Sequence, residues 1–101
     1  MEDSKVAIMS GALSDENRVK ILRMLASRQL CACNILSYLG ISQPTLSYHM
    51  KILYEAGFVS LTRKGKWTYY SLNPQTLTEY TLALEGISKS MLTDIPELDC
   101  E

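Results

Sequence analysis

One polar-faced helical segment, residues 41–53, constrains the fold of this chain more than any other stretch. Ser42 is a residue type that favours the N-cap of a helix, and Pro44 is tolerated only in a helix's first turn. Apolar residues then recur at helical spacing, and a glycine follows. A shorter helix is predicted just before it, over residues 34–39, joined through Gly40. This succession is the helix-turn-helix arrangement, in which the second, recognition helix reads DNA.

The exposed face of the recognition helix is rich in hydrogen-bond donors and acceptors rather than in paired charges. A solvated helix more often carries Glu and Lys pairs there. Amide, hydroxyl, imidazole and ammonium groups instead suit base edges and phosphate oxygens. The sequence therefore predicts double-stranded operator DNA as a partner. The expected contacts on this helix are Gln43, Thr45, Ser47, Tyr48, His49 and Lys51.

A basic β-hairpin is predicted directly after the recognition helix. Residues 58–62 and 67–72 are rich in strand-forming types, and Gly65 lies in the turn between them. Charged turns are common on solvated surfaces. In this position, however, the hairpin matches the wing of a winged helix-turn-helix, which lies along neighbouring phosphates and adds affinity that is independent of base sequence. The cations expected to make these contacts are Arg63, Lys64 and Lys66.

The charge distribution supports an anionic partner for the middle of the chain. The 101 residues carry a net charge of −1, but residues 18–72 hold eight Lys or Arg and one acid, a balance of +7. Residues 73–101 hold one Lys and six acids. The local field decides what binds where. Because no apolar run reaches the roughly 20 residues of a membrane span and no signal peptide is evident, we expect a cytoplasmic protein without membrane contact.

The chain is expected to form one mainly α domain with a β-hairpin wing, an α+β winged helix-turn-helix, over residues 1–101. The second helix should be N-capped by Ser14. The last helix has a longer apolar stripe than a small winged helix needs, so it and the first helix are expected to form a two-fold dimer interface. The alternative is that both helices only cover the monomer core. The expected bounds are about 4–13 and 15–27 for the first two helices, 32–56 for the helix-turn-helix, 58–72 for the wing, 74–93 for the last helix and 94–101 for an acidic tail.

Four segments resemble the ArsR/SmtB family of metal-sensing repressors. They are residues 12–22 (ALSDENRVKIL), 30–36 (LCACNIL), 43–53 (QPTLSYHMKIL) and 57–70, and the likeness extends over about residues 5–93 in the family's order and spacing. The resemblance implies a homodimeric repressor that binds DNA without a cofactor and leaves DNA when an inducer binds.

Cysteines are the only thiol ligands in the chain, and they define the expected inducer site. Residues 74–93, where the family's zinc sensors bind their metal, contain neither His nor Asp. Thiolates favour thiophilic ions, and the resemblance of Cys31 and Cys33 to the arsenic-sensing branch implies trivalent arsenic or antimony. Cadmium, lead and bismuth stay open as alternatives. That branch often has a third cysteine where this chain has Leu36, so Cys100 is a possible third ligand.

Backbone conformation decides whether Cys31 and Cys33 can bind one ion. On an α-helix residues i and i+2 project about 200° apart, whereas in extended backbone they project to the same side. Because the pair lies where the third helix begins, an inducer bound to both thiols is expected to fray the first turn and tilt the recognition helix.

Other functions use the same residues differently. The cysteines can be small buried residues without a ligand. A thiol redox or persulfide sensor of the same fold would pair Cys31 or Cys33 with Cys100. An enzyme fits poorly, because no general-base histidine lies near the cysteines in sequence and no glycine-rich phosphate loop is present. A plain protein-interaction module does not explain the basic wing.

Overall fold

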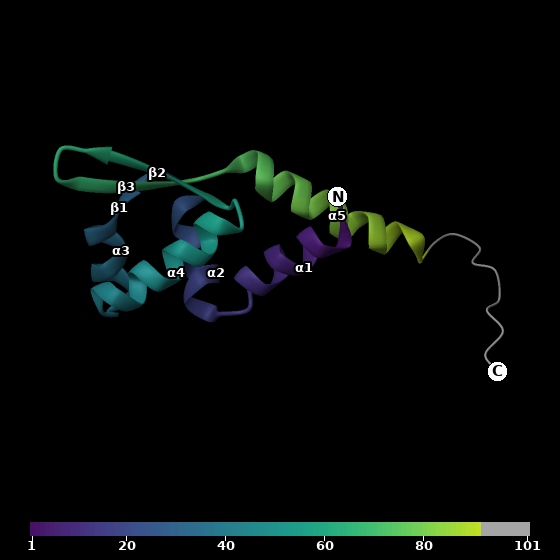
Figure 1. Ribbon diagram of the computed structural model, residues 1–101, viewed down its shortest axis with the longest axis horizontal. Helices are drawn as coiled ribbons and strands as arrows, with labels where there is room; N and C mark the ends of the chain where they lie inside the picture. Colours follow the sequence, from purple (N-terminus) through teal and green to yellow (C-terminus); the bar gives the residue numbers. More distant parts are fainter. Residues whose placement is uncertain (92–101) are drawn as a thin grey trace.

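Five helices and three strands form the part of the chain that the computed structural model describes, residues 1–91 (Figure 1). They are α1 (Asp3–Ala12), α2 (Glu16–Leu25), β1 (Leu30–Cys31), α3 (Ala32–Leu39), α4 (Gln43–Glu55), β2 (Val59–Lys64), β3 (Trp67–Leu72) and α5 (Pro74–Ser90). The predicted winged helix-turn-helix is confirmed, with α3 and α4 as its two helices and β2 and β3 as its wing. The tail expected at 94–101 lies outside the described residues.

The start of α2 corrects one detail of the prediction. Asp15, not Ser14, is the N-cap, and its carboxylate accepts hydrogen bonds from the backbone N–H groups of Asn17 and Arg18 at 2.8 and 3.3 Å. Ser14 is engaged elsewhere, because its hydroxyl donates to the carbonyl of Gly11 at 2.6 Å. A carboxylate at this position also interacts favourably with the positive end of the helix dipole.

β1 adds a third strand that the sequence did not predict. It pairs antiparallel with β3, which places Leu30 opposite Tyr70 and Cys31 opposite Tyr69. β2 pairs with the other edge of β3, and Gly65, with φ +60°, makes the turn between them. The strand order is therefore β1-β3-β2. Cys31 consequently belongs to the same sheet as the wing.

The core lies where α2, α3 and α4 meet the sheet. Its largest fully buried side chains are Met9, Ile21, Ile35, Met50, Leu53 and Phe58. The start of α5 joins this core through Tyr80, whose ring meets Phe58 edge to face at 5.7 Å between centroids. The hydroxyls of Tyr80 and Ser10 are 2.8 Å apart, so α5 is also linked to α1.

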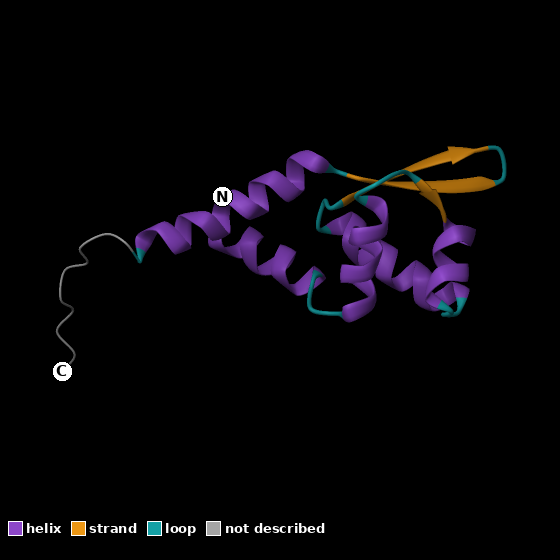
Figure 2. Ribbon diagram, turned by 180° about the vertical axis from the view of Figure 1, so that it is seen from behind, coloured by secondary structure: helices purple, strands orange, loops and turns teal. Residues whose placement is uncertain are grey.

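Helices α1 and α5 extend together away from the helix-turn-helix (Figure 2). Part of their apolar surface has no partner within the described chain. The exposed large side chains on these helices and at the end of α5 are Ile8, Leu82, Leu84, Ile87 and Met91. Within residues 1–91 no helix has the length and apolar character needed to cross a membrane.

Candidate nucleic-acid interface and cysteine pair

The outer face of α4 carries five of the six polar side chains predicted to contact DNA. The helix begins at Ser42, whose hydroxyl accepts from the Thr45 N–H at 3.3 Å and donates to the Thr45 hydroxyl at 2.8 Å. Pro44 lies in the first turn, where its missing N–H costs no helical hydrogen bond. The five exposed side chains are Gln43, Thr45, Ser47, Tyr48 and Lys51.

His49 lies on the opposite, inner face of α4, so the prediction that it belongs to the DNA-facing surface is wrong. It is only 6% exposed. The physical reason is its position three residues after Leu46 and one before Met50, within the apolar stripe that helical periodicity turns toward the core. A buried imidazole needs a hydrogen-bond partner, and Arg18 supplies it at 2.9 Å between Nη1 and His49 Nδ1.

The buried side chains of Arg18 and His49 and the partly exposed carboxylate of Asp15 form a polar junction where α1, α2 and α4 meet. Arg18 donates from Nε to the carbonyl of Ala12, the last residue of α1, at 2.8 Å. Because a guanidinium only donates, His49 Nδ1 must accept, which places the proton of the neutral ring on Nε2, 3.9 Å from Asp15 Oδ1. Desolvation raises the pKa of Asp15, but hydrogen bonds from the backbone N–H groups of Asn17 and Arg18, together with the positive charge of Arg18, hold this pKa below its usual value of 3.8.

The wing presents the three predicted cations to solvent. Arg63 and Lys64 lie at the end of β2, and Lys66 follows in the turn. Aromatic rings of β3 lie close to both ammonium groups: Lys64 Nζ is 5.3 Å from the ring centroid of Tyr69, and Lys66 Nζ is 5.7 Å from that of Trp67. The hairpin lies on the same half of the molecule as α3 and α4, away from α5 (Figure 1).

Cys31 and Cys33 meet at the junction between β1 and α3. Their sulfur atoms are joined as a disulfide, with Cα atoms 5.4 Å apart. Cys31 has extended dihedrals, φ −80° and ψ 158°, and only Cys33 lies within the helix. The sulfurs therefore meet without unwinding of the first turn, and the expected fraying is not required. Cys31 is buried and Cys33 is exposed.

Asn34 is the polar neighbour of this pair. Its Oδ1 lies 2.9 Å from Cys31 Sγ and accepts from the Cys31 N–H at 3.4 Å. Within residues 1–91, no group of three His, Cys, Asp or Glu side chains is placed to hold a metal ion. Cys100, which the sequence analysis gave as a possible third ligand, lies outside the described residues.

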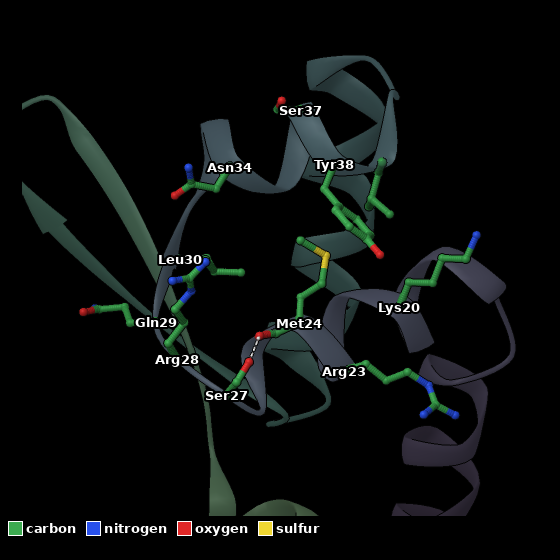
Figure 3. A pocket seen from close by; sticks show the side chains of 11 residues that line it. Lys20, Arg23, Met24, Ser27, Arg28, Gln29, Leu30, Asn34, Ser37 and Tyr38 are labelled. Atoms are coloured by element: carbon green, nitrogen blue, oxygen red, sulfur yellow. Dashed lines mark hydrogen bonds between the residues drawn. The ribbon is translucent and has the colours of Figure 1, made fainter.

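A basic groove between α2 and α3 was missed by the sequence analysis (Figure 3). Its volume is about 1240 Å³, and its lining includes the cations Lys20, Arg23 and Arg28 and no acidic residue. In the sequence analysis these cations contributed only to the net positive charge of residues 18–72. That net charge gave no sign that α2 and the segment after it place these three cations around a single groove beside α3.

Comparison with known sequences gives a consistent family. The profile of a family described as bacterial regulatory protein, arsR family, matches residues 15–60. An arsenical resistance operon repressor of Staphylococcus aureus is 40% identical over 78 residues, which cover 77% of this chain and 75% of that protein. One of Staphylococcus xylosus is 36% identical over 90 residues, covering 89% and 86%. The transcriptional repressor SdpR of Bacillus subtilis is 41% identical over 68 residues, covering 67% and 76%.

Solved structures share the fold. A crystal structure described as an ArsR family transcriptional regulator, RHA00566, superposes with a TM-score of 0.85 at 14% identity, covering 94% of this chain and 98% of that one. The homodimeric winged helix-turn-helix DNA-binding domain Mb0332 from Mycobacterium bovis superposes with a TM-score of 0.70 at 22% identity, covering 98% and 97%.

Proposed function

Because the chain belongs to the ArsR family of bacterial regulatory proteins, it is a DNA-binding transcriptional repressor, and we propose that trivalent arsenic or antimony releases it from its operator by binding Cys31 and Cys33. The observation that carries the proposal is the meeting of the two sulfur atoms where β1 ends and α3 begins. The sequence identity between this chain and two arsenical resistance operon repressors supports this inducer class. Soft thiolates are the ligands that such ions prefer.

We assign sequence reading to the exposed face of α4 and phosphate contacts to the wing. The amide of Gln43 and the hydroxyl of Ser47 are exposed and suit base edges. Replacing either residue by alanine should reduce discrimination between operator and unrelated DNA, which competition binding would measure. Unchanged discrimination would reject this face as the reading surface. The remaining proposed contacts are Thr45, Tyr48, Lys51, Arg63, Lys64 and Lys66.

We propose that the repressor is a homodimer joined through α1 and α5. Both helices carry exposed apolar side chains, among them Ile8 on α1 and Leu84 and Ile87 on α5. Where exposed apolar side chains gather on one surface of a soluble protein, they mark an interaction site. A second copy of the chain covers it symmetrically and fixes the spacing of two recognition helices on two half-sites.

The test of the inducer site is the pair of variants Cys31→Ser and Cys33→Ser. Serine keeps the size of the side chain but supplies no soft thiolate, so both variants should bind operator DNA normally and fail to leave it when arsenite or antimonite is added. Fluorescence anisotropy of a labelled operator measures both properties. Normal release from either variant would reject the assignment.

One observation favours a second candidate, a thiol redox sensor. The sulfurs of Cys31 and Cys33 are bonded to each other, and in a reducing cytoplasm such a disulfide is regulatory rather than structural. Under this alternative the reduced dithiol binds DNA and oxidation releases it. A wild-type complex that persists at saturating arsenite yet dissociates on mild oxidation would replace the metal assignment with the redox one.

A further inference from the structure

The cysteine pair supplies two sulfur ligands, whereas trivalent arsenic bound by thiols takes three. Leu36 cannot ligate, and within residues 1–91 no third group is placed beside the pair. The third ligand must therefore come from the surroundings of Cys31 and Cys33. This inference rests on the proposed binding of arsenic to that pair.

Neither cysteine lines the basic groove between α2 and α3, but sequence neighbours of the pair do (Figure 3). Leu30, which precedes Cys31 in β1, and Asn34, in the first turn of α3, both line it. Asn34 Oδ1 is also 2.9 Å from Cys31 Sγ. One amide thus forms part of the groove and contacts a proposed arsenic ligand, so a molecule in the groove lies next to the thiol site.

The charges of the groove select an anion. Arg23 and Arg28 line it and form no ion pair with another described residue. Lys20, the third cation of the lining, is 3.4 Å from Glu16 and is partly neutralised. The Arg23 and Arg28 guanidinium groups point away from each other (Figure 3), so each can pair with a separate carboxylate through two hydrogen bonds.

The size of the groove and its apolar lining residues indicate a small organic ligand rather than a bare oxyanion. Its volume of about 1240 Å³ is somewhat above the roughly 300–1,000 Å³ of typical pockets for small organic ligands, and one arsenite would fill only a small part of it. Met24, Leu30 and Tyr38 contribute apolar surface. Residues of α4, β2 and β3 are absent from the lining, so the groove shares no side chain with the proposed DNA-contacting surface.

We infer that the groove binds a low-molecular-mass thiol bearing carboxylate groups, and that the sulfur of this thiol is the third ligand of the arsenic. Its carboxylates pair with Arg23 and Arg28. Arsenous acid, As(OH)₃, exchanges its three hydroxyl groups for the sulfurs of Cys31, Cys33 and the added thiol. The three S–H protons leave with these hydroxyls as three molecules of water. Arsenic stays trivalent, and the exchange requires both cysteines to be reduced.

The experiment compares two added monothiols of similar size with the reduced full-length protein. Mercaptosuccinate carries two carboxylates and 1-thioglycerol carries none. Release of labelled operator by arsenite should need about tenfold less arsenite with mercaptosuccinate, the effect of two partly exposed ion pairs. Native mass spectrometry should find one arsenic and one mercaptosuccinate per protomer. Equal half-release concentrations with the two thiols would overturn the inference.

The variant Arg23→Ala/Arg28→Ala tests the groove directly. It should abolish the advantage of mercaptosuccinate, whereas Arg23→Lys/Arg28→Lys should keep part of it because the charges are retained. The alanine variant should bind operator DNA like the wild type when arsenic is absent. If it binds DNA more weakly and with a shallower salt dependence, the two arginines contact phosphates and the inference is wrong.

Two further arms separate this inference from the proposed function. Phenylarsine oxide carries a phenyl group at the third position and binds two thiols with loss of one water. It should release the wild type and the Arg23→Ala/Arg28→Ala variant equally. If it fails to release the wild type, the inducer site at Cys31 and Cys33 is itself wrong. If Cys100→Ser abolishes release by arsenite with either thiol, the chain supplies the third ligand and the added thiol does not.

Discussion

The buried position of His49 leads to a prediction that separates it from its exposed neighbour Tyr48. Replacing His49 by leucine puts an apolar side chain of similar size in its place in the core. The replacement removes the hydrogen-bond acceptor for Arg18 Nη1. Arg18 is itself only 8% exposed and keeps one other bond, from Nε to the carbonyl of Ala12. The variant therefore leaves part of a buried guanidinium without a partner.

The expected loss follows from the energetics of buried, charge-assisted hydrogen bonds. Such a bond contributes about 1.5–3 kcal/mol, and because the Nε bond of Arg18 persists, we expect a loss of about 2 kcal/mol in the free energy of unfolding. An unfolding entropy of about 2.1 cal/mol/K per residue gives about 0.2 kcal/mol/K for a chain of this length, so the melting temperature should fall by about 10 °C.

The assay is thermal unfolding followed by circular dichroism, with operator affinity measured well below the transition. His49→Leu should melt early and still bind DNA at low temperature. His49→Asn should recover part of the loss, because its amide oxygen can accept from Arg18. Tyr48→Phe is the matched control and should leave the melting temperature unchanged. A normal melting temperature for His49→Leu combined with lost operator affinity would show that His49 faces DNA and would refute the reasoning.

Three further predictions concern the wing, the dimer and pH. Replacing Lys64 and Lys66 by alanine should weaken binding to all DNA sequences alike and reduce the slope of log affinity against log salt by about 0.9 for each phosphate that is no longer neutralised; an unchanged slope would reject the wing as a phosphate-binding element. Leu84→Glu or Ile87→Glu should produce monomers in sedimentation and weaken operator binding, and an unchanged mass would reject the interface. The folded-state pKa of Asp15 lies below 3.8, so its carboxylate stabilises the fold above pH 3.8 and this contribution is lost as the pH falls through the folded-state pKa. Asp15→Asn keeps the N-cap but cannot titrate, so its melting temperature should fall less on acidification; parallel curves for the two proteins would contradict this.

The sequence predicted those parts of the fold that depend on local chemistry. Ser42 and Gly40 were identified because an N-cap hydroxyl and a glycine with positive φ are properties of single residues. The strand β1 was missed because two residues show no periodicity, and its formation depends on β3 much later in the chain. The N-cap of α2 was wrongly assigned to Ser14, because both Ser and Asp favour that position and their order in the sequence does not show which side chain caps the helix.

Some features of the candidate site were also missed because they depend on contacts between segments that are distant in the sequence. Polar residues are placed on surfaces by default, and His49 was assigned to the DNA face although it follows Leu46 at core spacing. Its hydrogen-bond partner in the core is Arg18, a residue of another helix, and no local pattern links the two residues. The groove around Arg23 and Arg28 likewise forms only when α2 and α3 pack, which no local pattern records.

We propose that a small inducer acts on the DNA-binding surface through the position of Cys31 in the sheet. Cys31 belongs to β1, which pairs with β3 at Tyr69, whereas Cys33 lies within α3. Under this proposal, an arsenic atom bound to both sulfurs links the sheet to α3 and displaces α3 against the sheet. On one side this displacement reaches the wing, because Tyr69 belongs to β3 and its ring lies 5.3 Å from Lys64 Nζ. On the other side it reaches the recognition helix, because Ile35 of α3 belongs to the same core cluster as residues of α4. The two routes have different signatures: displacement of the wing lowers affinity for all DNA and the salt dependence with it, whereas displacement of α4 lowers the preference for the operator.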